Sequence, residues 1–92
     1  MKNKIVESVD LPDGRVVVFD WSSDGAYRHE NLVCFNNDGS VRWRPGLPDN
    51  SGPDCFVGVT IDNGEIRANT MSCFALWLDP LTGETLKSVF TK

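Results

Sequence analysis

Turn residues divide this chain into short segments, and no segment between them is suited to a long helix. The sequence has three alanines and no glutamine. No stretch of about ten residues combines apolar positions at helical spacing with freedom from Gly, Pro and Asn/Asp clusters. Ten valines, three isoleucines, five threonines and nine aromatic residues instead suit the pleated, half-buried surface of a sheet. The sequence therefore predicts an all-β fold with no substantial helix.

Four strands are predicted in the first half of the chain, joined by two turns and one polar loop. Pro12-Asp13-Gly14 reverses the chain because proline presets one turn dihedral and glycine accepts a positive φ. Asn37-Asp38-Gly39 forms a second hairpin turn in the same way. Residues 16–19 are apolar on both faces, which predicts a central strand. The predicted strands cover residues 5–11, 15–21, 30–36 and 40–44, and residues 22–29 form the loop.

The second half is predicted to contain four more strands. Asn63-Gly64 is the strongest hairpin signal in the chain, and residues 79–83 form another turn. Cys55, Val57, Val59 and Ile61 alternate along the first of these strands and are expected on one face. The predicted strands cover residues 55–61, 65–69, 73–78 and 84–90. The total is about eight short antiparallel strands in two four-stranded sheets, arranged as a propeller-blade-like pair or a β-sandwich.

One domain is expected for residues 1–92, because a chain of 92 residues matches the size of a single compact core. Residues 45–54 contain three prolines and two glycines, which neither extend a ladder nor fit inside a helix. This segment is predicted to be a loop that joins halves 1–44 and 55–92. We expect the halves to depend on each other, since a four-stranded sheet with one wet apolar face is marginal by itself.

The two halves are similar in sequence around one turn each. Residues 31–43 resemble residues 74–86, and Gly39 and Gly83 lie 44 residues apart, within the ~40–50 residue spacing of propeller blades. On these residues each half resembles one blade of a quinoprotein-like β-propeller. Trp43 stands at the tryptophan position of that repeat, four residues after the glycine. Trp43 and Trp77 both lie at apolar positions within predicted strands and are expected in the core or on a sheet face.

The second half matches the same repeat at one position and departs from it at another. Asp79 stands at the aspartate position of the family repeat, where the first half has Asn36, whereas Lys87 stands where a tryptophan is expected. Two blades cannot close a ring around a cofactor, so the resemblance implies the fold but no quinone site. No cofactor is predicted.

Charge narrows the classes of partner and the expected location. The net charge is -4 with a pI near 4.7, which is the wrong sign for holding phosphates, so nucleic acid is not expected as a partner. No apolar run approaches the ~18 residues of a membrane span, and charged residues occupy the start of the chain where a signal peptide would be apolar. We expect a cytoplasmic protein that does not bind membranes.

Catalytic and metal-binding patterns are weak. His29 is the only histidine, and no serine or cysteine motif accompanies it as a nucleophile. Cys34, Cys55 and Cys73 form no Cys-x-x-Cys pair and are expected to be reduced core thiols. Residues 49–54 lack the alternate acidic positions and the closing glutamate of a calcium loop, so their carboxylates are expected in solvent. No enzyme activity and no metal site are predicted.

A partner-binding surface is predicted on the two longest loops, where aromatic and basic side chains stand among carboxylates. Trp, Tyr and Arg are the residues that dominate interface hot spots. Trp21 has two open interpretations, a cap on the core or an anchor for a partner. The predicted interface residues are Trp21, Asp24, Tyr27, Arg28, His29, Glu30, Asp49 and Asp54.

Two classes of function follow. Small immunity proteins of bacterial contact-dependent growth inhibition systems are acidic and of this size, and those that counter ribonuclease toxins resemble this chain at residues 11–15, 30–35 and 89–92. The resemblance implies a non-enzymatic protein that binds a basic toxin, most simply a nuclease, and occludes its active site. The alternative is a stand-alone propeller-like module with a structural or small-ligand-binding role. We expect a monomer and leave a homodimer open.

Overall fold

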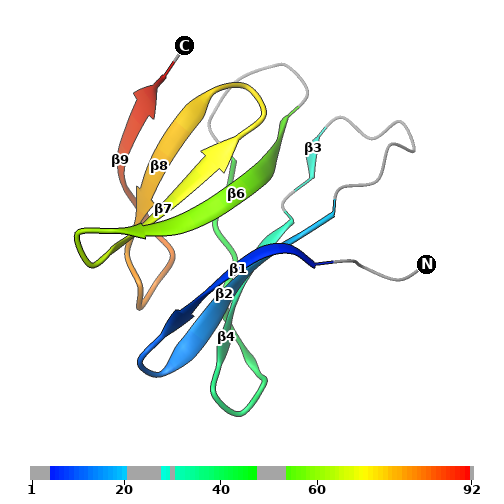
Figure 1. Ribbon diagram of the computed structural model, residues 1–92, viewed down its shortest axis with the longest axis vertical. Helices are drawn as coiled ribbons and strands as arrows, with labels where there is room; N and C mark the ends of the chain where they lie inside the picture. Colours follow the sequence, from blue (N-terminus) through cyan, green and yellow to red (C-terminus); the bar gives the residue numbers. More distant parts are fainter. Residues whose placement is uncertain (1–4, 21–27, 30, 48–53, 92) are drawn as a thin grey trace.

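The computed structural model describes residues 5–20, 28–29, 31–47 and 54–91 and contains nine strands there (Figure 1). Eight of them pair antiparallel in two four-stranded sheets, which confirms the predicted all-β class. No helix occurs in the described ranges, so none there could cross a membrane. The strands are β1 (Ile5–Leu11), β2 (Gly14–Phe19), β3 (Arg28–His29), β4 (Leu32–Asn36), β5 (Val41–Trp43), β6 (Asp54–Asp62), β7 (Glu65–Thr70), β8 (Phe74–Leu78) and β9 (Thr85–Phe90).

The first sheet has the strand order β1-β2-β4-β5 and is built from the two predicted hairpins. Leu11 pairs with Gly14 across the first turn, and Asn36 accepts a backbone hydrogen bond from Gly39 in the second. β2 lies between β1 and β4, and its residues Val16, Val17 and Val18 are buried. The prediction that this apolar run is a central strand is confirmed, because both of its faces are covered.

The second sheet has the antiparallel order β6-β7-β8-β9, and the two-residue strand β3 extends it at β6. Asn63 and Gly64 both have positive φ, 54° and 79°, as a two-residue hairpin turn requires. β3 pairs parallel with β6, so residues 28–29 belong to a strand although they were predicted to lie in a loop. A two-residue strand has no detectable alternation, which is why the sequence pattern missed it.

One predicted alternation is wrong. Cys55 and Val59 are buried, but Val57 is 41% exposed and Ile61 is 40% exposed, while Phe56 is fully buried. The cause is an irregularity in the β6–β7 pairing between Phe56 and Gly58, which shifts the register by one residue. Such a bulge turns the intervening side chain outward, so the residues of β6 do not keep one face along the strand.

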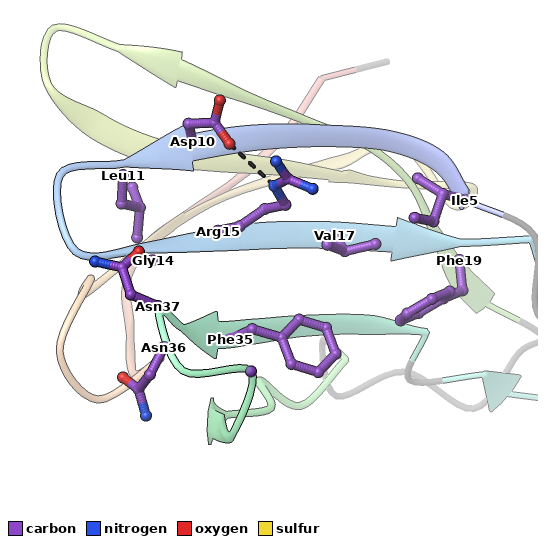
Figure 2. Close-up of a pocket in the computed structure, with 11 residues that line it drawn as sticks. Ile5, Asp10, Leu11, Gly14, Arg15, Val17, Phe19, Phe35, Asn36 and Asn37 are labelled. Carbon is purple, nitrogen blue, oxygen red and sulfur yellow. Dashed lines mark hydrogen bonds and ion pairs between the residues drawn. The ribbon is translucent and has the colours of Figure 1, made fainter.

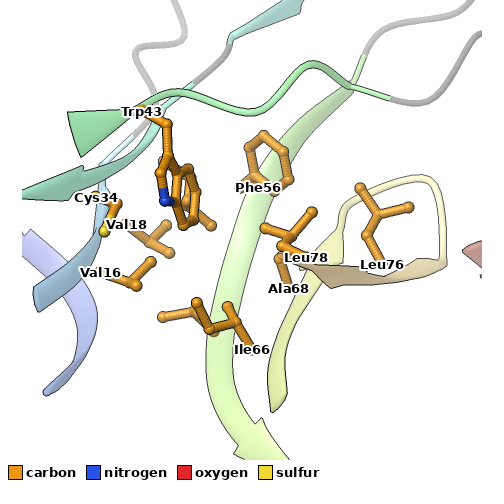
Figure 3. Close-up of a cluster of buried hydrophobic side chains, with 11 residues drawn as sticks. Val16, Val18, Cys34, Trp43, Phe56, Ile66, Ala68, Leu76 and Leu78 are labelled. Carbon is orange, nitrogen blue, oxygen red and sulfur yellow. The ribbon is translucent and has the colours of Figure 1, made fainter. Parts of the chain in front are cut away.

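The main core lies between the two sheets, whose apolar faces point toward each other (Figure 3). β1 and β2 of the first sheet pack against β6 of the second. Burying this interface supplies the main favourable free energy for a fold of this type. The core cluster consists of Val16, Val18, Leu32, Cys34, Trp43, Phe56, Val59, Ile66, Ala68, Leu76 and Leu78.

Trp43 of the first sheet packs on the turn between β8 and β9 of the second sheet. Its Nε1 donates a hydrogen bond to the carbonyl oxygen of Pro80 at 2.8 Å. Its ring covers Gly83 so closely that a Cβ built there would lie 2.5 Å from ring atom Cε3. Gly83 has a φ of 76°, so both its backbone conformation and its neighbour require glycine. The expectation that Trp43 is a core residue is confirmed.

The predicted linker, residues 45–54, is described at both of its ends. Pro45 is buried and Leu47 packs against the core, while residues 48–53 lie outside the described residues. β6 begins at Asp54, so the last linker residue belongs to a strand. The division into halves 1–44 and 55–92 stays a prediction about folding. Splitting the chain at Pro48 tests it, since two fragments that fold independently would refute the expected dependence of the halves on each other.

Candidate functional site

The pairing of β3 with β6 brings together the ends of the two long loops that were predicted to bind a partner. Arg28 pairs with Asp54, and His29 pairs with Cys55. The pairing is parallel, so the first loop enters β3 beside the point where the second loop enters β6 (Figure 1). We call this end of the molecule the loop end and define it by Ile5–Val6, Phe19–Asp20, β3, residues 54–57 and Met71.

Asn31 fixes the base of the first loop to both sheets. Its side-chain Nδ2 donates to the carbonyl oxygens of Phe19, at 2.6 Å, and Phe56, at 2.9 Å. Its Oδ1 accepts a hydrogen bond from the Phe56 amide at 2.8 Å, and its own carbonyl accepts one from the Phe19 amide. One amide side chain thus satisfies backbone groups of β2 and β6, which would cost free energy if left unpaired in the interior.

Asp54 fixes the base of the second loop from inside the protein. The side chain is only 1% exposed. Its Oδ1 accepts hydrogen bonds from the amides of Cys55, at 2.9 Å, and Ser72, at 3.1 Å, and its Oδ2 accepts one from the Ser72 hydroxyl at 2.7 Å. The expectation that this carboxylate lies in solvent is wrong, because these donors compensate for its burial. Asp54 thus connects the start of β6 to Ser72 by hydrogen bonds.

Of the other predicted interface residues, the structure describes only Arg28 and His29. The backbone of Arg28 and His29 lies in β3 at the loop end, and not in the loop where both residues were predicted. The assignment of a partner-binding role to all eight residues stays a prediction. Five of them lie outside the described residues, namely Trp21, Asp24, Tyr27, Glu30 and Asp49.

Exposed apolar side chains at the loop end were missed by the sequence reasoning. Val6 is 52% exposed and Val57 is 41% exposed, and each lies at a register shift of its strand. Ile5 pairs with Phe19 at the same end, and Met71 donates its amide to the Cys55 carbonyl; they are 53% and 45% exposed. No sequence signal reveals a bulge in advance, so the alternation rule assigned these side chains wrongly or not at all.

Among the described residues, the thiols of Cys34 and Cys55 are buried, and no cluster of metal ligands is found. No group of three His, Cys, Asp or Glu side chains that could hold a metal ion occurs in the described ranges. Burial raises the pKa of the Cys55 thiol, and the neighbouring Asp54 charge raises it further. Burial also raises the pKa of Cys34, with the Asp13 charge adding to this and Arg42 opposing it. Both thiols are therefore protonated near neutral pH and poor nucleophiles.

A second feature is a shallow groove of about 680 Å³ on the first sheet, on the side away from the second sheet (Figure 2). Phe19 and Phe35 pack edge to face there, with ring centroids 6.4 Å apart. Arg15 and Asp10 form an exposed ion pair at 3.0 Å beside them. The lining of the groove thus combines apolar and aromatic side chains with charged and amide side chains.

Comparison with known proteins places the chain in a family. Residues 1–90 match the model of a family described as "Domain of unknown function (DUF7957)". The chain belongs to this family. No curated protein and no solved structure matches it. The match covers nearly the whole chain, and the description of the family names no activity.

Proposed function

We propose that this member of the DUF7957 family is a non-enzymatic inhibitor that binds a basic protein through its loop end in the cytoplasm. The observation that carries the proposal is the β3–β6 pairing, which sets the end of the segment that contains Trp21 and Tyr27 beside the end of the segment that contains Asp49. Two loops that enter the sheet at adjacent positions can present their side chains to one partner. The hydrogen bonds of Asn31 and Asp54 hold both loop bases in place, which lowers the entropy lost on binding.

Charge and apolar exposure agree with a protein partner. The net charge of -4 attracts a basic protein and speeds its encounter, whereas it repels nucleic acid. The exposed side chains of Val6, Val57 and Met71 add apolar contact area at the same end. Interfaces combine such an apolar centre with a polar rim.

More specifically, we propose that the protein is an immunity protein that occludes the active site of a cognate toxin, and we expect the toxin to be a ribonuclease. A toxin that holds nucleic acid carries a basic surface, and an acidic protein placed over that surface excludes the substrate by charge and by volume. The resemblance to small immunity proteins at residues 11–15, 30–35 and 89–92 supports this form.

Co-expression with the toxin-like product of the adjacent reading frame tests the proposal. We expect cells to survive with the wild-type chain, and calorimetry to detect a complex. Trp21→Ala and Tyr27→Ala should mainly speed dissociation, each weakening binding by about 2 kcal/mol or more if the side chain is an anchor. Leu81→Ala is the matched control, since this 70% exposed side chain lies in the turn after β8, away from the loop end. Cell death despite abundant folded protein, with no complex by calorimetry, would refute the proposal.

Association rates test the role of the two predicted rim carboxylates, Asp24 and Asp49. Asp24→Ala and Asp49→Ala should slow association and reduce its salt dependence, because rim charges act mainly during encounter. Glu65→Ala is the control, since Glu65 is exposed at the β6–β7 hairpin, at the opposite end of β6 from the loop end. Equal effects of all three changes would mean that only total charge matters and that the loop end is not the interface.

The alternative function, a stand-alone propeller-like module, is favoured by one specific contact. Trp43 of the first sheet docks on Gly83 and the Pro80 carbonyl of the second sheet, which links the two halves at the positions that the blade resemblance aligns. A small-ligand role would require saturable binding to the groove beside Phe19 and Phe35. Screening by ligand-observed NMR distinguishes this role, since an inhibitor of a toxin needs no such ligand.

A further inference from the structure

Each sheet has one face that meets the other sheet in the core and one face that points away from it. The inner faces meet in the core, so the faces that point away from it are the outer faces. Register assigns side chains to them because directly paired residues project to the same side of a sheet. The outer face of the first sheet includes Arg15, Val17, Phe35 and Val41, and that of the second includes Arg67, Ala75, Trp77, Lys87 and Val89.

The sequence repeat relates these outer faces to the interface already present in the core. Residues 31–43 align with residues 74–86 through Gly39 and Gly83, which places Lys87 at the position of Trp43. The strand register agrees with this alignment. Trp43 pairs with Cys34, and Lys87 pairs with Trp77, which is the residue that the repeat aligns with Cys34. The outer face of the second sheet therefore corresponds to the inner face of the first sheet.

The converse correspondence also holds. Leu76 and Leu78, on the inner face of the second sheet, align with Val33 and Phe35, on the outer face of the first. The contact between the sheets inside one chain can thus be repeated between chains, with the second sheet of one copy against the first sheet of the next. Each copy has one face of each kind.

Gly39 and Gly83 stand at corresponding turns, and among the described residues only the turn of the second sheet, at Gly83, is covered by a tryptophan. Trp43 covers Gly83, which is buried. Its counterpart Gly39 is exposed with a φ of 90°, and a Cβ built there would find no atom within 4 Å among the described residues. The groove beside Phe19 and Phe35 adjoins this turn and includes Gly39 in its lining (Figure 2). A space for a docking side chain is therefore present at the turn of the first sheet.

Charge complementarity between the two outer faces favours a second copy of this chain as the docking partner. On the outer face of the second sheet, the Lys87 ammonium lies 4.8 Å and the Arg67 guanidinium 5.3 Å from the centre of the Trp77 ring. Arg67 Nε is buried and has no hydrogen-bond partner among the described residues. At the turn of the first sheet, the Asp38 carboxylate is exposed, and hydrogen bonds from Ser40 lower its pKa, so it is charged at neutral pH.

We infer that the outer face of the second sheet of one copy docks on the outer face of the first sheet of a second copy, with Lys87 placed at the Asp38 turn. The two faces differ, so the contact is heterologous and repeats into a closed ring or an open chain. At the positions of Val16, Cys34 and Trp43 the docking face carries Arg67, Trp77 and Lys87. Such a polar interface associates reversibly and weakens as salt screens its charges. This self-association would replace the monomer expected from the sequence.

Sedimentation equilibrium of the full chain over a concentration series up to about 1 mM tests the inference. We expect mass-action association at low salt that weakens at high salt. Lys87→Glu and Asp38→Lys should each weaken association at least about tenfold, and the double variant should regain most of the loss. A chain that stays monomeric throughout the series, or a double variant no stronger than the single variants, would overturn the inference.

A mixing experiment tests the head-to-tail geometry and does not depend on the Asp38 turn. Val41→Arg blocks the outer face of the first sheet, and Val89→Arg blocks that of the second; these side chains are 48% and 38% exposed, so folding should survive, as circular dichroism would verify. Each variant should be monomeric by itself, and an equimolar mixture should form a 1:1 dimer and nothing larger. Dimers of either variant by itself, or no complex in the mixture, would overturn the proposed contact.

Discussion

Replacing Gly83 with alanine tests the contact that joins the two sheets. The new Cβ would lie 2.5 Å, 2.6 Å and 2.9 Å from Cε3, Cδ2 and Cγ of Trp43, whose ring is held by the hydrogen bond to the Pro80 carbonyl. A residue with a Cβ at a φ of 76° costs about 1–2 kcal/mol, and the crowding of a packed core costs about 1–3 kcal/mol more. We expect Gly83→Ala to lower the free energy of unfolding by about 2–5 kcal/mol, measured by urea denaturation.

Gly39→Ala is the matched control for this change. Gly39 has a φ of 90° in the corresponding turn, but no atom lies within 4 Å of its built Cβ in the described chain. It should show the backbone cost of about 1–2 kcal/mol without the crowding. In a Trp43→Leu background the extra cost of Gly83→Ala should disappear, because the ring that causes it is gone. Equal destabilisation by Gly83→Ala and Gly39→Ala in the wild-type background would refute the reasoning.

Two further predictions concern the loop end and the thiols. Asn31→Ala should lower the free energy of unfolding by about 2–4 kcal/mol in urea denaturation, since backbone groups of β2 and β6 lose their partner, whereas exposed Asn37→Ala should change it little. Iodoacetamide followed by mass spectrometry should modify half-buried Cys73 in the native protein and spare Cys34 and Cys55 until it unfolds, because both are fully buried and burial raises their pKa; equal native labelling of all three would contradict this.

The features of the fold that follow from local chemistry were predictable from the sequence. Asn63-Gly64 can form a two-residue hairpin turn wherever it stands between strands, because both residues accept positive φ. The apolar run at residues 16–18 could be satisfied only by a strand covered on both faces, and β2 is such a strand. Trp43 was expected in the core from its apolar position within a strand, and the structure buries it there.

The features that depend on contacts distant in sequence were not predictable. Arg28 and His29 form β3 only because β6 lies beside them, and two residues carry no periodicity of their own. Asp54 was expected in solvent because its neighbours in sequence are turn residues, but its hydrogen-bond donors include Ser72, 18 residues away. Val57 is exposed because of a bulge in pairing with β7, which the alternation of β6 itself does not reveal.

The divergence between the two halves has a physical consequence for assembly. An interface that is never exposed can be entirely apolar, and Val16, Val18 and Cys34 on the inner face of the first sheet meet that condition. A face that must stay in water whenever a copy is undocked cannot be as apolar without becoming an aggregation surface. In the free chain, the cations of Arg67 and Lys87 partly cover the Trp77 ring and make the surface around it charged. When a carboxylate-bearing surface approaches, the apolar area of the ring is available for contact. The presence of lysine at the position of Trp43 is thus the change that turns a permanent sheet-to-sheet contact into one that can open.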